Sequence, residues 1–232
     1  MNPFTASKKL LTMSSVLVRH PEEIRFASRW FCSHLPGHSP FTEKTPWITY
    51  RAIEWLDSHL GRDMSVFEFG AGGSTLFFSE RVRRVVSVEH DEKFHQVVAR
   101  LLAESGIDNC ELILRRPQPL TDGGTSWEFV SHQAKYRGLS FEDYLKAIDD
   151  FPDASFDLVL VDGRARVESA RRAFRKIKPG GYLMLDNSDR PGYAEVGRML
   201  ETCERQDMPG ITPWNIEPSQ TTVWRIPASG TI

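Results

Sequence analysis

The stretch of sequence that decides the fold spans residues 66–75 and reads VFEFGAGGST. Its first half is apolar and β-rich, and its second half holds glycine at positions 70, 72 and 73. A helical pattern, STLFFSERV, follows over residues 74–82. A buried strand, a glycine turn and a helix in that order are typical of the first unit of an α/β sheet.

The chain on both sides of this stretch continues the alternation of strands and helices. Apolar or β-rich runs predict further strands at 83–89, 110–114, 156–162 and 182–187. The helix predicted after the second strand carries an apolar stripe formed by Phe94, Val97, Val98, Leu101 and Leu102. This alternation favours right-handed β-α-β units and a parallel sheet. The run TTVWRI, residues 221–226, predicts an antiparallel strand at the edge of that sheet.

Two segments depart from this alternation. Helical patterns at 21–35 and 46–60 flank a break that contains Pro36, Gly37 and Pro40. We therefore divide the chain into an N-terminal helical extension, residues 1–44, and a main domain, residues 45–232. Within that domain, residues 116–139 form a long polar interruption. Loops of this length in a compact domain are typically lids or binding loops, so we predict a lid there.

Composition excludes several classes of protein. The 232 residues hold 29 basic and 31 acidic side chains, a formal charge of −2, so no global basic field attracts nucleic acid. The apolar runs are much shorter than the ~20 residues of a membrane helix, and we expect no stable membrane insertion. Three widely spaced cysteines without a CxxC pair argue against a disulfide framework or thiolate zinc site. They favour a reducing compartment, which we interpret as the cytoplasm.

Acids and glycines follow the predicted strands. Ligands of open parallel sheets bind outside the carboxyl ends of the strands, so these residues are expected to share one rim. Glu89 ends the second strand about 20 residues after Gly70. A carboxylate there can accept hydrogen bonds from both hydroxyls of a ribose, which indicates a nucleoside cofactor. The alternative is that Glu89 is a solvated helix cap, a role that Asp91 could fill instead.

The order of these motifs resembles that of the class I S-adenosylmethionine-dependent methyltransferases over residues 45–226. VFEFGAGGST resembles their first motif, VVSVEHD their second, FDLVLVDG their fourth, and IKPGGYLML the approach to their fifth strand. The resemblance implies an α/β, Rossmann-like seven-stranded sheet flanked by helices, with S-adenosyl-L-methionine as cofactor. The cofactor-binding residues that it implies are Glu68, Gly70, Gly72, Ser74, Glu89, His90 and Asp162. Where the family often has an acidic adenine contact, this sequence has Arg115-Arg116-Pro117.

A second resemblance concerns a metal. Asp162, Asp186 and Asn187 are similar to the Asp…Asp-Asn set of the cation-dependent O-methyltransferases of the catechol and caffeoyl-CoA types. That similarity implies three oxygen ligands for Mg²⁺ and an oxygen acceptor. The sequence departs from that family at residues 163–166, GRAR, which replace a lysine-bearing stretch. The alternative is that Asp162 contacts cofactor or substrate directly, while Asp186 and Asn187 only cap their loop.

Two residues are candidates for catalysis. The resemblance implies that Asp162 faces the sulfonium side of the cofactor, and a hydroxyl acceptor needs its proton removed. His132, in the predicted lid, could act as a base because its unperturbed pKa is near neutrality, or it could simply be exposed. We interpret the basic run from Arg164 to Lys178 as mostly the solvated face of a helix, with Arg164 near the rim. Trp47 is expected in the core.

We therefore predict a methyltransferase that acts on a small molecule, at oxygen rather than nitrogen, without a nucleic-acid partner. Two other functions are left open. A nicotinamide-dependent oxidoreductase would require glycine at position 75, where this chain has Thr75. A non-catalytic protein with the methyltransferase fold would not need the intact glycine motif and Glu89. The sequence leaves a homodimer open and does not identify the acceptor.

Overall fold

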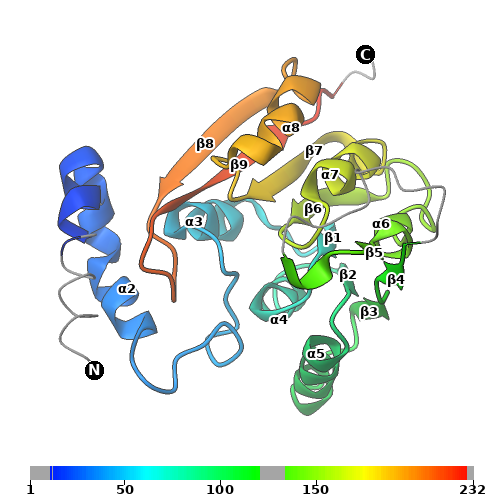
Figure 1. Cartoon of the computed structure of the whole chain (residues 1–232), viewed down its shortest axis with the longest axis horizontal. Helices are drawn as coiled ribbons and strands as arrows, with labels where there is room; N and C mark the ends of the chain where they lie inside the picture. The colour runs from blue at the N-terminus through cyan, green and yellow to red at the C-terminus, as the bar shows by residue number, and fades with distance from the viewer. Residues whose placement is uncertain (1–10, 12, 121–133, 229–232) are drawn as a thin grey trace.

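A single sheet of seven strands organises the molecule (Figure 1). The computed structural model describes residues 11, 13–120 and 134–228. The strand order is β3-β2-β1-β6-β7-β9-β8, the first five being parallel and the last two antiparallel. The strands are β1 Ser65–Phe69, β2 Arg84–Glu89, β3 Cys110–Leu114, β6 Phe156–Val161, β7 Ile177–Asp186, β8 Glu204–Gly210 and β9 Ser219–Arg225. This sheet confirms the predicted α/β, seven-stranded fold.

Helices cover both faces of the sheet because successive strand residues point to opposite sides. One buried cluster contains Val66, Leu158 and Leu160 with residues of α3 and α4; the other contains Phe67, Val159 and Val161 with residues of α6, α7 and α8. The helices are η1 Pro21–Phe26, α2 Ala27–Ser33, α3 Tyr50–His59, α4 Gly73–Ser79, α5 Glu92–Glu104, η3 Ala134–Tyr136, α6 Glu142–Lys146, α7 Arg166–Phe174, η4 Pro191–Tyr193 and α8 Ala194–Met199. Burial on both faces explains the nearly continuous apolar strands that the sequence shows.

The N-terminal segment packs into the same core as the sheet. Met13, Phe26 and Trp30 belong to the buried cluster that contains Val66. The Glu23 carboxylate is fully buried and accepts hydrogen bonds from Arg51 Nε at 2.6 Å and from the backbone N–H of Ile211 at 3.0 Å. These contacts attach η1 to α3 and to the loop after β8.

Two predictions about single elements are wrong, one about the position of a strand in the sheet and one about the start of a helix. The C-terminal strand β9 is not at the edge, because β8 pairs with it on the outer side. The sequence ERQDMPG of β8 has no apolar alternation and contains Pro209, as exposed edge strands tolerate. The second helix begins at Tyr50 and not at Pro46, because Thr49 keeps an extended backbone and its hydroxyl caps the helix at the N–H of Ala52.

The predicted lid is described only at its two ends. Strands β4 Gln118–Pro119 and β5 Leu139–Ser140 pair antiparallel, which brings the ends of the long loop together. Residues 121–133, and with them the catalytic candidate His132, lie outside the described residues. Within the described ranges, every helix is too short or too polar to span a bilayer.

Candidate active site

A cavity of about 880 Å³ opens at the carboxyl ends of β1, β2, β6 and β7. Each of these strands delivers residues to it, as the sequence predicts for an open parallel sheet. The predicted site residues that line it are Gly70, Gly72, Ser74, Glu89, His90, Asp162, Asp186 and Asn187. Glu68 is the predicted cofactor residue that the cavity lining does not include.

The glycine loop between β1 and α4 combines a tight turn with an open surface. Gly70 has a φ of +101°, and a Cβ added to it would lie 3.0 Å from Gly163 Cα. Glycine at position 70 therefore lets the loop pass close to the end of β6. Gly72 is extended, and a Cβ added there would meet nothing within 4 Å. The loop thus exposes its backbone to the cavity at Gly72.

Glu68 lies behind this loop. The side chain is fully buried, and its Oε1 accepts hydrogen bonds from the hydroxyls of Thr75 and Ser87. Burial raises the pKa of Glu68 to about 7. Thr75 Oγ1 in turn accepts the backbone N–H of Gly72 at 3.0 Å. Glu68 therefore supports the loop through Thr75, and this position does not fit the direct cofactor contact that the sequence predicts.

Glu89 ends β2 as a buried carboxylate held by backbone donors. Its Oε1 accepts the N–H groups of His90 and Asp91, both at 2.7 Å, and its Oε2 accepts the N–H of Ala71 at 3.1 Å. The alternative role as a solvated helix cap does not fit, because Asp91 caps α5 at the N–H groups of Lys93 and Phe94. With one bond accepted, Oε2 keeps capacity for a ligand hydroxyl.

His90 joins the cavity wall to the end of the predicted lid. Its Nε2 lies 2.6 Å from the Tyr136 hydroxyl, and the guanidinium of Arg164 lies 5.3 Å from the Tyr136 ring centre. Arg164 Nε also donates to His90 Nε2 at 3.4 Å. The sequence identifies Arg164 as a rim residue, but it gives no signal for its contact with Tyr136.

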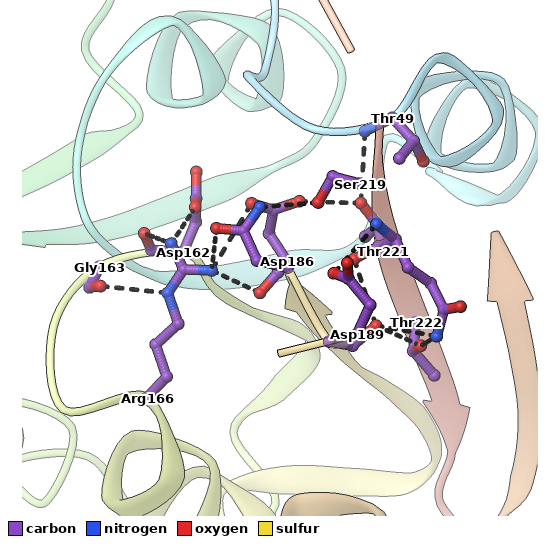
Figure 2. A network of polar contacts seen from close by, with 12 residues as sticks. Thr49, Asp162, Gly163, Arg166, Asp186, Asp189, Ser219, Thr221 and Thr222 are labelled. Carbon is purple, nitrogen blue, oxygen red and sulfur yellow. Dashed lines mark hydrogen bonds and ion pairs between the residues drawn. The ribbon is translucent and has the colours of Figure 1, made fainter. Parts of the chain in front are cut away.

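The corner of the cavity between β6 and β7 holds Asp162, Asp186 and Asn187, the predicted metal ligands. Figure 2 shows Asp162 and Asp186 there with Arg166. The Arg166 guanidinium lies among the three, with Nη2 2.7 Å from Asp162 Oδ1 and Nη1 3.3 Å from Asn187 Oδ1. Burial, and then the negative charge of Asp186, raise the pKa of Asp162 well above its usual range. Burial also raises the pKa of Asp186. The basic run is therefore not uniformly solvated, because Arg166 is only 7% exposed.

Another part of the cavity wall comes from residues that sequence patterns do not reveal. Trp47, expected in the core, is 50% exposed and lines the cavity. Thr212, in the segment between β8 and β9, is 2% exposed and also lines it. Among the described residues, the Thr212 hydroxyl has no hydrogen-bond partner. A buried hydroxyl without a partner on a cavity wall is available to a ligand.

Comparison with known proteins identifies the family. The family model described as a methyltransferase domain matches residues 67–188, more than half of the 232 residues. The chain belongs to this methyltransferase family. The match favours methyl transfer over the nicotinamide-dependent oxidoreductase that the sequence leaves open. None of the curated proteins matches the chain significantly.

Solved structures share the class I methyltransferase fold with this chain. The O-methyltransferase TomG from Streptomyces achromogenes, in complex with S-adenosylmethionine, has a TM-score of 0.59 at 18% identity over 86% of this chain and 98% of that chain. An rRNA methylase from Streptococcus thermophilus gives 0.54 at 14% identity over 76% and 95%. The protein SMU.1697c from Streptococcus mutans, solved with S-adenosylhomocysteine, gives a TM-score of 0.50 at 12% identity over 75% of this chain and 94% of that chain. At these identities the likeness shows the fold alone.

Proposed function

We propose that this methyltransferase transfers the methyl group of S-adenosylmethionine to a hydroxyl oxygen of a small molecule. The observation that carries the proposal is the position of Asp162. Its carboxylate lines the same cavity as Glu89 and the glycine loop, and its Oδ1 accepts a hydrogen bond from Arg166 Nη2 at 2.7 Å. A carboxylate oxygen beside a cofactor site can accept the proton that a hydroxyl loses during methylation.

The residues around the glycine loop fit S-adenosylmethionine. The open surface at Gly72 leaves space beside the backbone, and Glu89 Oε2 can accept a ribose hydroxyl. Bound there, the cofactor supplies a methyl carbon that its positive sulfur already activates. The main task of the protein is then to hold the two reactants in line. Gly70 and Glu89 make the cofactor site rigid. Gly70 fixes the turn after β1, and three backbone N–H groups hold the Glu89 carboxylate.

The remaining lining of the cavity, which includes Trp47 and Thr212, supports a small-molecule acceptor. Trp47 offers an apolar surface, and the hydroxyl of Thr212 offers a hydrogen bond. The N-terminal residues Pro40 and Phe41 line the same cavity, so the segment before α3 borders the space. A total volume of about 880 Å³ is of the size of small-molecule pockets, which measure roughly 300–1,000 Å³. A net charge of −2 offers no general attraction for RNA.

Asp162 takes the role of base in this proposal. Its carboxylate lines the cavity beside the cofactor residues, within reach of an acceptor bound there. During transfer, the acceptor hydroxyl gives its proton to Asp162, and the acceptor oxygen forms the bond to the methyl carbon. S-Adenosylmethionine held by Glu89 and the glycine loop would supply the methyl carbon and leave as the neutral thioether S-adenosylhomocysteine. His132 remains a predicted alternative base outside the described residues.

Partition of a labelled methyl group tests the proposal. The protein is incubated with methyl-tritiated S-adenosylmethionine and, separately, with small-metabolite, RNA and protein fractions of a cell extract. We expect label in the small-metabolite fraction, and mass spectrometry of the product should locate the methyl group on oxygen. Transfer to RNA or protein would contradict the acceptor class. Binding of S-adenosylhomocysteine without any transfer would favour the non-catalytic alternative.

A further inference from the structure

The structure assigns to Arg166 the place of a metal ion: we propose that its guanidinium is a built-in cation that fills the Asp162–Asp186–Asn187 oxygen site and keeps divalent metals out. This inference is about cation binding, so it does not depend on the acceptor or on the proposed reaction. It means that this chain has the three oxygen-bearing residues of a metal site, but that a guanidinium takes the place of the metal ion.

The backbone before α7 directs Arg166 into this position. Ala165 precedes the helix in a left-handed conformation, with φ 46° and ψ 47°. Because of this turn, the Arg166 side chain points back toward the ends of β6 and β7, as Figure 2 shows. Arg166 is the first residue of α7, and it is only 7% exposed although the helix carries other, more exposed arginines.

The oxygen atoms around the guanidinium satisfy its hydrogen-bonding capacity. Nε donates to Gly163 O at 3.2 Å, and Nη2 donates to Asp162 O at 2.6 Å and Asp162 Oδ1 at 2.7 Å. Nη1 donates to Asp186 O and to Asn187 Oδ1, the latter at 3.3 Å, and lies 3.5 Å from Asp186 Oδ2. A guanidinium has five N–H groups and cannot be deprotonated in proteins. All five donors therefore have an acceptor.

This arrangement does not fit Mg²⁺. Magnesium requires near-octahedral oxygen ligands at about 2.0–2.1 Å, and it repels a second positive charge at the same site. The three predicted ligands contact the guanidinium instead, so a divalent ion could enter only if Arg166 left. If the Arg166 side chain left these oxygen atoms, its charge would either stay buried without partners or have to move into solvent. Either change costs free energy.

Strand β9 holds Asp186 and Asn187 independently of Arg166. Asp186 Oδ1 accepts the hydroxyl of Thr221 at 3.0 Å, and Asn187 Nδ2 donates to Ser219 Oγ at 2.9 Å. Both partners lie on β9, next to β7. The Asp186 carboxylate and the Asn187 amide would thus remain in place when the guanidinium is removed, beside Asp162 at the end of β6. Carboxylate and amide oxygens are ligands that divalent cations bind, and the guanidinium would no longer occupy the space between them.

A titration with Mn²⁺ tests the inference. Binding is measured as the decrease of the electron paramagnetic resonance signal of free Mn²⁺. The wild type is expected to leave millimolar Mn²⁺ free. Arg166→Met, which keeps a long side chain without the charge, should bind one Mn²⁺ at least tenfold more tightly than the wild type. Asp186→Asn in that background should abolish the gain. Arg166→Lys is the matched control, because its ammonium group keeps a positive charge at the site.

Two results would overturn the inference. One is Mn²⁺ binding by the wild type that Asp186→Asn removes, and this measurement needs no Arg166 variant. The other is a folded Arg166→Met protein, verified by circular dichroism, that binds no Mn²⁺. If Arg166→Met does not fold, Arg166→Gln serves as the second variant under the same criterion. The methyl-label experiment and the Mn²⁺ titrations are independent of each other. Failure of the proposed methyl transfer can therefore be told apart from failure of the proposal that Arg166 excludes metal.

Discussion

The backbone N–H of Ala71 donates a hydrogen bond to Glu89 Oε2 at 3.1 Å, and this bond ties the glycine loop after β1 to the end of β2. The loop and the acid are the two strongest sequence signals of the cofactor site. In the structure the two are also joined, because the Glu89 carboxylate accepts backbone N–H groups from the glycine loop and from the residues that follow β2. A change at Glu89 is therefore expected to affect the loop as well as the cofactor.

Glu89→Gln is expected to weaken the binding of S-adenosylhomocysteine at least tenfold. A hydrogen bond to a charged group contributes roughly 1.5–3 kcal/mol, and an amide would also turn donor hydrogens toward backbone N–H groups. Calorimetric titration measures the effect. Glu111→Gln, an exposed carboxylate on the neighbouring β3 that pairs with Arg84, is the control. Unchanged affinity in Glu89→Gln would rule out its role in cofactor binding.

Gly70 and Gly72 should respond differently to alanine. Gly70 has a positive φ of +101° and a close neighbour in Gly163, so Gly70→Ala is expected to lower the free energy of unfolding by about 1–3 kcal/mol. Gly72 is extended with open space around it, so Gly72→Ala should fold with nearly wild-type stability. Its methyl group would enter the cofactor space and weaken S-adenosylhomocysteine binding. Urea unfolding and calorimetry separate the two effects, and the opposite pattern would contradict this division.

The sequence predicts the strands better than it predicts the corners of the site. Parallel strands buried on both faces are recognisable as apolar runs, and the acids that end them, such as Glu89 and Asp162, follow directly. Arg166 is not recognisable in this way, since helical periodicity assigns it to a solvated face. Its burial depends on the left-handed turn at Ala165, which no residue pattern encodes. Strand β8 was missed for a related reason, because an exposed edge strand needs no apolar alternation.

Residues that become important through distant contacts are the least predictable. Trp47 and Thr212 come from opposite ends of the chain and meet at one cavity only after the N-terminal segment packs against the β8–β9 hairpin. Glu68 was predicted as a cofactor residue because it belongs to the first motif. Its side chain instead lies buried behind the glycine loop, where its Oε1 accepts hydrogen bonds from the hydroxyls of Thr75 and Ser87.

Glu68 should make stability depend on pH between its ordinary and raised pKa values. Burial raises the pKa of the folded state from 4.5 to about 7, so the native protein holds this proton more tightly than the unfolded chain. The free energy of unfolding then falls as pH rises through that interval, by a total of about 3 kcal/mol. Glu68→Gln removes this dependence. Its stability relative to wild type should be higher at pH 8 than at pH 5 in urea unfolding. A constant difference would contradict the assignment.

The unpartnered hydroxyl of Thr212 should lower the stability of the ligand-free protein. A buried polar group without a partner costs about 1–3 kcal/mol, so Thr212→Val, which keeps the shape, should stabilise the protein by about 1 kcal/mol. Thr221→Val is the matched control. Its hydroxyl donates to Asp186 at 3.0 Å, so the same change there should destabilise. Thermal unfolding without ligand gives both values, and equal losses in the two variants would show that Thr212 has a partner.

Asp162→Asn should reduce methyl transfer without a matching loss of cofactor binding. The amide oxygen of Asn can still accept the Arg166 hydrogen bond that Oδ1 accepts at 2.7 Å, so the corner keeps its geometry. The variant cannot take the acceptor proton, and removal of a general base typically costs about 10²–10⁴-fold in rate. Tritiated methyl transfer to the active metabolite fraction measures the rate, and calorimetry measures the affinity for S-adenosylhomocysteine. Asp189→Asn, near the same corner but outside the cavity lining, should leave both values unchanged. Equal losses of rate and affinity in Asp162→Asn would instead assign Asp162 to the cofactor, the role that the sequence leaves open.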